Sequence, residues 1–152
     1  DILKIIDADH NRTDLKIKST RVVVSPENAR ERLATFIKRA RRELLIYDMN
    51  VSDDDMIGLL KEKAESGVKI RVLGGVEKKW EPELAWRVRP FTARKLHVRC
   101  MVRDRQAVFV GSQSLRKLEL DERREVGLIT KDRRTVNRIA ATFAADWKAH
   151  RN

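Results

Sequence analysis

The sequence has 152 residues, of which 41% are hydrophobic and 38% are charged, and its 34 Lys and Arg against 23 Asp and Glu give a formal net charge of +11. This length and apolar fraction exclude a disordered chain and fit one domain with its own core. No run of 18 apolar residues predicts a membrane-spanning helix, and the single cysteine, Cys100, excludes an intrachain disulfide and a multi-cysteine metal site. The positive charge indicates either an anionic partner (nucleic acid, anionic lipid or a phosphorylated substrate) or a well-solvated surface.

The first half of the sequence alternates between strand and helix patterns. Residues 1–20 are polar and weakly periodic, and we interpret them as a lead-in or linker to one domain spanning residues 21–152. Apolar spacing then predicts, in chain order, a strand at 21–25, a helix at 26–42, a strand at 44–47, a helix between 52 and 67, and a strand at 68–73. Ser25 is expected to cap the first of these helices. The alternation predicts an α/β fold with right-handed crossovers and a mostly parallel mixed sheet flanked by helices.

The second half contains shorter strands. Residues 76–92 show no regular period, and strict alternation at 95–102 then predicts a strand that forms a hairpin with a second strand at 107–110. A further strand is predicted at 125–130, and Asp132 is a suitable cap for a last helix. The alternation places one set of side chains on the same face of the first hairpin strand. That set comprises Lys95, His97, Arg99, Met101 and Arg103.

The residues that favour chemistry are concentrated around this hairpin. His97 supplies an imidazole that can attack or transfer a proton, and Arg99 supplies a permanent planar cation that suits phosphate oxygens. Asp104 follows at the predicted turn. At the exit of the second strand, Gly111 allows a ligand to approach the backbone and Ser112 offers a hydroxyl to an anion.

Glu125, in the predicted strand at 125–130, can hold His97 in one tautomer, as the carboxylate of a catalytic triad does. Each of these residues also has a plain structural interpretation. Asp104 suits any turn, and Glu125 can pair with a neighbouring arginine such as Arg124. It is the ordered combination that indicates a site.

This combination resembles the signature of the phospholipase D superfamily, in which His-x-Lys is followed after four residues by Asp and after six more by Gly-Ser-x-Asn. The matching positions are His97, Arg99, Asp104, Gly111, Ser112 and Ser114. Glu125 is similar to the family's downstream glutamate, and the resemblance covers residues 21–149, about one half-unit of the family's fold. Two positions depart from the signature, because Arg99 stands where the family has Lys and Ser114 stands where it has Asn.

The resemblance implies a mechanism that needs two half-units. In the family, one histidine attacks phosphorus to form a phosphohistidine, the histidine of the other half-unit protonates the leaving oxygen, and water or an alcohol resolves the intermediate. The implied roles are nucleophile or general acid for His97, orientation of His97 for Glu125, support of the motif for Asp104, and phosphate binding for Arg99, Ser112 and Ser114. No cofactor is expected, since cations supply the electrostatic stabilisation. No metal is expected either, because the three histidines lack metal-ligand spacing.

One such motif is present, so a complete site is expected to need a second half-unit as partner. A homodimer with twofold symmetry can supply it, or a preceding half-unit of a longer parent chain. The start without Met on a polar lead-in slightly favours the parent chain. The expected function is a phosphodiesterase or phosphatidyltransferase half-site whose substrate is a phosphodiester in a phospholipid or a nucleic acid.

Two other functions remain as alternatives. A non-catalytic module with a degenerate site would bind nucleic acid or anionic lipid through its basic face, and a structural half-domain would complete a site whose chemistry lies in its partner. Residues 87–105 hold seven Lys or Arg and one acid, Asp104, which focuses a positive field on the segment of His97. Trp80 and Trp86 are the candidates for stacking on bases, with covering a sheet edge as their other interpretation.

Overall fold

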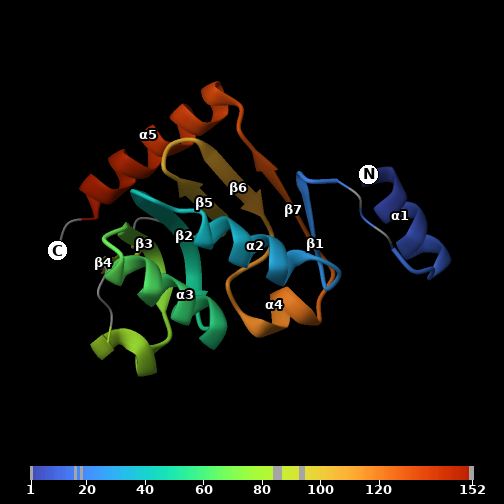
Figure 1. Ribbon diagram of the computed structural model, residues 1–152, viewed down its shortest axis with the longest axis horizontal. Coiled ribbons are helices and arrows are strands. Elements are labelled where there is room, and N and C mark those ends of the chain that lie inside the picture. The colour runs from blue at the N-terminus through green and yellow to red at the C-terminus, as the bar shows by residue number, and fades with distance from the viewer. Residues whose placement is uncertain (1, 16, 18, 84–86, 93–94, 151–152) are drawn as a thin grey trace.

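One seven-stranded sheet forms the middle of the molecule. The computed structural model describes residues 2–15, 17, 19–83, 87–92 and 95–150 (Figure 1). The sheet has the strand order β1-β7-β6-β5-β2-β3-β4. Its strands are β1 (Val22–Ser25), β2 (Glu43–Val51), β3 (Lys69–Val76), β4 (Arg87–Arg89), β5 (Arg99–Arg103), β6 (Ala107–Gly111) and β7 (Glu125–Thr130).

The sheet is mixed, as the sequence predicts, and the α/β class with flanking helices is confirmed. Strands β1, β2, β3, β4 and β6 run in one direction, and β5 and β7 run against them. The prediction of a mostly parallel sheet therefore holds for strand directions but is wrong for neighbouring pairs. Among the described strands only β2–β3 and β3–β4 pair in parallel, because β5 and β7 insert between strands of the other direction.

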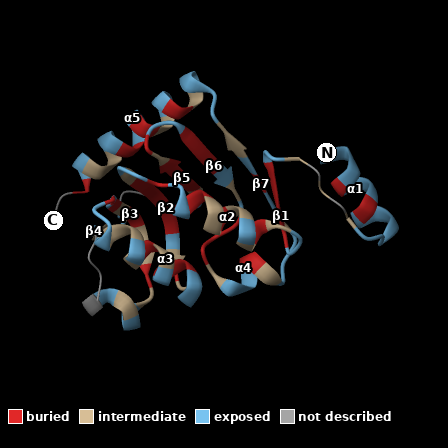
Figure 2. Ribbon diagram, in the orientation of Figure 1, coloured by how far each residue is buried: buried red, intermediate tan, exposed pale blue. Residues whose placement is uncertain are grey.

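Helices cover both faces of the sheet. They are α2 (Ala29–Lys38), α3 (Asp54–Glu65) and α4 (Lys117–Asp121) on one face and α5 (Arg133–Ala149) on the other, with a 3-10 helix, η1 (Lys78–Glu83), after β3. Because side chains alternate along a strand, Ile46 of β2 packs with α2 and α3 whereas its neighbour Tyr47 packs with α5. Figure 2 shows the buried strands between these helical layers. In the described part of the chain, no helix has the length and apolar character needed to cross a membrane.

The segment predicted as a lead-in contains a helix, α1 (Ile2–Asn11), which lies beyond β1 at the end of the sheet (Figure 1). Ile5 of α1 is buried in a small apolar cluster with Val22 and Val24 of β1. Ile17 packs against the same cluster. Isolated apolar residues in this polar stretch thus attach it to the edge strand.

The first predicted helix cap is wrong. α2 begins after Asn28 rather than after Ser25. The Asn28 side chain is bonded to β1 instead of capping the helix, since its Oδ1 accepts from the N–H of Val24 at 2.8 Å and its Nδ2 donates to the carbonyl of Val22 at 3.4 Å. The Asn28 side chain thus bonds to the backbone of β1 instead of the first N–H groups of the helix, and α2 starts after Asn28.

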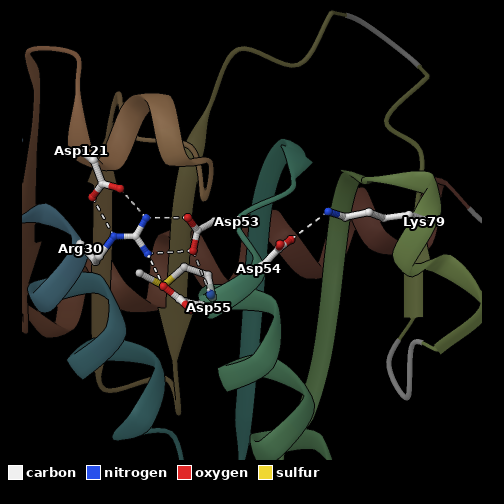
Figure 3. A network of polar contacts seen from close by, with 7 residues as sticks. Arg30, Asp53, Asp54, Asp55, Lys79 and Asp121 are labelled. Atoms are coloured by element: carbon white, nitrogen blue, oxygen red, sulfur yellow. Dashed lines mark hydrogen bonds and ion pairs between the residues drawn. The ribbon is translucent and has the colours of Figure 1, made fainter.

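Arg30 of α2 joins acidic side chains from neighbouring helices (Figure 3). Its Nη2 lies 2.6 Å from Oδ2 of Asp53 and 2.6 Å from Oδ2 of Asp121, and its Nη1 lies 3.1 Å from Asp55. Asp53 caps α3 by accepting the N–H of Met56, and Asp121 ends α4. One guanidinium therefore fixes α2, α3 and α4 relative to one another through paired, charge-assisted hydrogen bonds.

Asp104 anchors the turn between β5 and β6 to the start of β2. It is buried, its φ is +52°, and its carboxylate accepts the N–H groups of Arg41 at 3.0 Å, Arg42 at 2.7 Å and Glu43 at 3.0 Å. Burial by itself would raise the pKa of Asp104, but these amide bonds and the charge of Arg103 together hold it below its ordinary value. The carboxylate is thus stabilised in its charged form.

We expect Asp104→Ala to lower the free energy of unfolding by about 2–4 kcal/mol, because several backbone N–H groups lose their acceptor. Asp104→Asn keeps one carbonyl oxygen and tolerates the positive φ, so it should lose less. Urea unfolding at pH 7 measures both variants, and equal stability of wild type and Asp104→Ala would contradict the anchoring role.

The same carboxylate makes a pH prediction. Its stabilisation is fully present above the unfolded-state pKa of about 3.9 and is lost as pH falls through the lower folded-state pKa. The difference in stability between wild type and Asp104→Asn should therefore shrink in acid.

Candidate active site

His97 and Arg99 lie where β5 begins. The strand starts at Arg99, four residues later than the sequence predicts, so His97 precedes it and is exposed. The Nη1 of Arg99 donates to the carbonyl oxygen of His97 at 3.2 Å, and within the described residues its buried Nε has no partner. Both residues therefore lie at the end of the sheet where β2 and β6 have their carboxyl ends.

A buried carboxylate lies beside them at the carboxyl end of β2. Asp48 is 2% exposed. It accepts the hydroxyl of Ser114, the N–H of Asn50 at 3.1 Å and the N–H of Leu115 at 2.8 Å. Burial raises the pKa of Asp48, and these hydrogen bonds and the charge of Arg99 partly offset that rise. Asp48 thus connects β2, the loop after β6 and the guanidinium of Arg99.

Gly111 and Ser112 end β6 in close contact with β7. A Cβ at Gly111 would lie 2.5 Å from Oε1 of Gln113 and 2.8 Å from the Cα of Gly127, so a side chain at this position would collide with β7. The Oγ of Ser112 accepts the N–H of Val126 at 3.1 Å. Ser112 is exposed, and its hydroxyl and backbone N–H continue the pairing of β6 with β7.

Glu125 begins β7, and its side chain is 12% exposed. Its Oε1 lies 3.4 Å from the Nε of Arg123, whereas Arg124, the expected alternative partner, pairs with other carboxylates. The backbone carbonyl of Glu125 accepts Nε2 of Gln113 at 3.1 Å. Glu125 and His97 are both among the described residues, and no hydrogen bond joins them.

Asp104 lies at the other end of β5. It follows Arg99 by five residues along an extended strand, which separates it from Arg99 by about 17 Å at a rise of about 3.4 Å per residue. Its contacts are the backbone amides at the start of β2. The structure therefore brings His97 and Arg99 together with Ser112 and Ser114 at one end of the strands, and places Asp104 at the opposite end.

A cavity of about 360 Å³ opens beside His97. Its walls are mostly apolar and include Tyr47, Phe91, Leu96, Val98, Val110 and Ile139. Cys100 also lines it, but burial raises the pKa of this thiol to about 12, so the thiolate nucleophile is scarce at neutral pH. His97 is thus the candidate nucleophile at this cavity.

Neither of the other two histidines, His10 and His150, lines this cavity. His10 is in the last turn of α1, and the ring of His150, after α5, stacks on Phe91 with centroids 4.4 Å apart. Trp80 packs against the core on the α3 side, while Trp86 and Arg94 lie outside the described residues. No group of three His, Cys, Asp or Glu in the described ranges could hold a metal ion.

A comparison with known protein families identifies the family of this chain. The family model for the cardiolipin synthase, phospholipase D-like (PLD-like) domain matches residues 33–147. The chain belongs to the phospholipase D-like family. No curated protein sequence matches it.

Solved structures of low sequence identity share this phospholipase D-like fold. NucT from Helicobacter pylori matches with a TM-score of 0.74 at 19% identity, covering 84% of this chain and 94% of that one. Nuc from Salmonella typhimurium, a phospholipase D family member, matches with a TM-score of 0.73 at 16% identity, covering 86% and 94%. Polyphosphate kinase from Porphyromonas gingivalis matches with a TM-score of 0.80 at 18% identity, covering 97% of this chain and 25% of that one.

The two departures from the phospholipase D signature meet at Asp48. Arg99 brings its charge close to this carboxylate, and Ser114, itself buried, donates a hydrogen bond to it. Sequence reasoning missed Asp48. The available signal was an acid directly after the apolar run at 44–47, at the carboxyl end of a central strand where ligands bind in α/β folds.

We expect the stability of wild type to fall more steeply between about pH 4 and pH 7 than that of Asp48→Asn. The folded-state pKa of Asp48 is raised above the unfolded value of about 3.9, so the folded protein holds this proton more tightly. The resulting stability is present below about pH 4 and lost as pH rises through the folded-state pKa, and asparagine does not titrate. Urea unfolding at pH 4, 5.5 and 7 compares the two proteins, and parallel profiles would count against a perturbed Asp48.

Proposed function

We propose that this chain supplies one half of a phospholipase D-type active site, as a phosphodiesterase or phosphatidyltransferase that acts through a phosphohistidine at His97. The position of His97 carries the proposal. The residue is exposed at the rim of a cavity, and Arg99, two residues later, is bonded to its carbonyl. An imidazole nucleophile beside a planar cation suits attack on a phosphodiester.

The proposed reaction has two displacements. An imidazole nitrogen of His97 forms a bond to phosphorus as the bond to the leaving oxygen breaks, and this oxygen takes a proton from an acid of the second half-unit. Water then attacks phosphorus and gives its proton back to that group, the phosphorus–nitrogen bond breaks, and His97 is regenerated. An alcohol in place of water gives transfer instead of hydrolysis.

The other residues take supporting roles in this proposal. Arg99 stabilises the charge on the phosphate oxygens, and Ser112, exposed at the end of β6, contacts the same phosphate. Ser114 donates to the buried Asp48, so it acts on phosphate through the placement of Arg99. Asp104 supports the motif by holding the hairpin on β2.

The sheet face around His97 offers a surface for the second half-unit. α5 covers Val108, whereas Val98, Val110 and Leu128 are 48%, 42% and 46% exposed. Val110 and Leu128 are direct partners across β6 and β7, so their side chains are neighbours on this face. Adjacent exposed apolar side chains mark contacts with another protein surface, and a second half-unit placed here would face His97.

We expect His97→Ala to lower phosphodiester hydrolysis by about 10³-fold or more, because the nucleophile is removed. Its circular dichroism spectrum should match wild type, since His97 is exposed. Assays on DNA, RNA and anionic phospholipid vesicles, with the chain alone and in any longer parent chain, identify the substrate. His10→Ala, which removes another exposed histidine, is the matched control.

Turnover that persists in His97→Ala, or no difference between His97→Ala and His10→Ala, would overturn the catalytic assignment. Mass spectrometry of enzyme quenched at neutral pH during turnover should find the phosphorylated adduct on His97 in wild type.

If a second copy of this chain supplies the other half-unit, Leu128→Asp should convert a dimer into a monomer, because it places a charge in an apolar interface. Light scattering measures the mass of both proteins. Leu118→Asp is the matched control, since Leu118 is 40% exposed on α4. A dimer that survives Leu128→Asp would place the interface elsewhere.

A non-catalytic module that binds phosphate, nucleic acid or anionic lipid is the alternative, and the placement of Glu125 favours it. Its carboxylate pairs with Arg123 and has no bond to His97, so the imidazole lacks an orienting acid within this chain. Under this alternative, wild type shows no turnover on any substrate of the panel. Binding then persists in His97→Ala and weakens steeply with salt.

A further inference from the structure

A second cavity, of about 800 Å³, opens at the end of the sheet opposite His97. It lies between α2, the start of β1 and the ends of β5 and β7. Arg103 ends β5 at this cavity whereas Arg99 begins the strand, so β5 separates the two sites. We call this cavity the basic hollow because of the cationic side chains that line it. These are Arg21, Arg32, Arg39, Arg103 and Lys131.

The cationic side chains of the basic hollow outnumber its acidic ones. Glu31 and Asp132 are its acidic lining residues, and Asp132 already accepts the N–H and the hydroxyl of Thr135, at 2.8 and 2.6 Å, as the cap of α5. In the ranges that the structure describes, none of the cationic lining residues forms an ion pair. By contrast, Arg30, two residues before Arg32 on the same helix, binds carboxylates on α3 and α4.

Two guanidinium groups of the basic hollow are incompletely hydrogen-bonded within the described residues. The Nε of Arg32 is buried and unpartnered among the described residues. Arg103 lies over the ring of Phe36, 4.8 Å from its centroid, and its Nη1 reaches a carbonyl only at 3.5 Å. Burial, together with the charge of Arg39, lowers the pKa of Arg103 against the opposing charge of Asp104. A bound anion would relieve this repulsion.

We infer that the basic hollow binds a compound with consecutive phosphate groups. Guanidinium groups bind phosphate oxygens in pairs, and several of them converge here on one space. A single phosphate would leave most of the 800 Å³ unfilled and engage few of the cations, whereas tripolyphosphate or the triphosphate of a nucleotide is longer and carries enough negative charge to face several of them. The basic hollow contains neither His97 nor Arg99, so this binding site is distinct from the proposed active site.

Titration calorimetry of the full chain with tripolyphosphate and with ATP tests the inference. We expect binding to wild type, and binding weakened by about 10-fold or more in the Arg32→Gln/Arg103→Gln double variant, because charged hydrogen bonds to phosphate are lost. Arg87→Gln, which removes an exposed arginine of β4, should bind as wild type does. The tighter of the two ligands identifies the source of the phosphates.

His97→Ala separates this inference from the proposed function, because it should bind tripolyphosphate as wild type does even if its hydrolysis is lost. Arg39→Gln, at an exposed position, repeats the test if the double variant does not fold. A single-stranded oligonucleotide is titrated as a third ligand. The inference is overturned if neither tripolyphosphate nor ATP binds, or if the oligonucleotide alone binds. It is also overturned if Arg87→Gln weakens binding as much as the double variant does, or if His97→Ala loses binding.

Discussion

The buried carboxylate at the end of β2 is the constraint on which the geometry around His97 depends. A charge inside a protein costs free energy, and the hydrogen bonds from Ser114 and Leu115 and the nearby charge of Arg99 offset that cost for Asp48 only in part. Arg99 is half-buried near this carboxylate, whereas His97, two residues earlier, is exposed. Asp48 therefore joins the end of β2 to the loop after β6 below the site.

Strand β5 carries an arginine at each of its ends. The sequence places a dense group of cations at residues 87–105, and the structure puts two of them, Arg99 and Arg103, at opposite ends of β5. Arg99 and Arg103 face the same side of β5 because they are four residues apart on an extended strand. Arg99 lies near the buried carboxylate of Asp48, whereas Arg103 lines an open cavity in which cations outnumber acids, so identical side chains on one strand have different electrostatic surroundings.

Periodicity in the sequence was sufficient to predict most strands and helices, and the motif spacing identified the family. Long-range contacts were not accessible in this way. Ser114 meets Asp48 across 66 residues, and nothing local to either residue predicts the contact. Glu125 was expected to orient His97, but the nearer Arg123 pairs with it. Asn28 displaced Ser25 at the start of α2 because β1 lies close enough to bind its side chain, which is a tertiary effect.

The uncovered apolar strip formed by Val98, Val110 and Leu128 has a consequence for the behaviour of separate copies. Each copy carries a net charge of +11, so like-charge repulsion opposes contact between these strips. This repulsion extends over about 30 Å in 0.01 M salt but only about 8 Å in 0.15 M salt. Ionic strength therefore controls the colloidal stability of the protein: dilute salt keeps the molecules dispersed, and added salt exposes the attraction between their apolar faces.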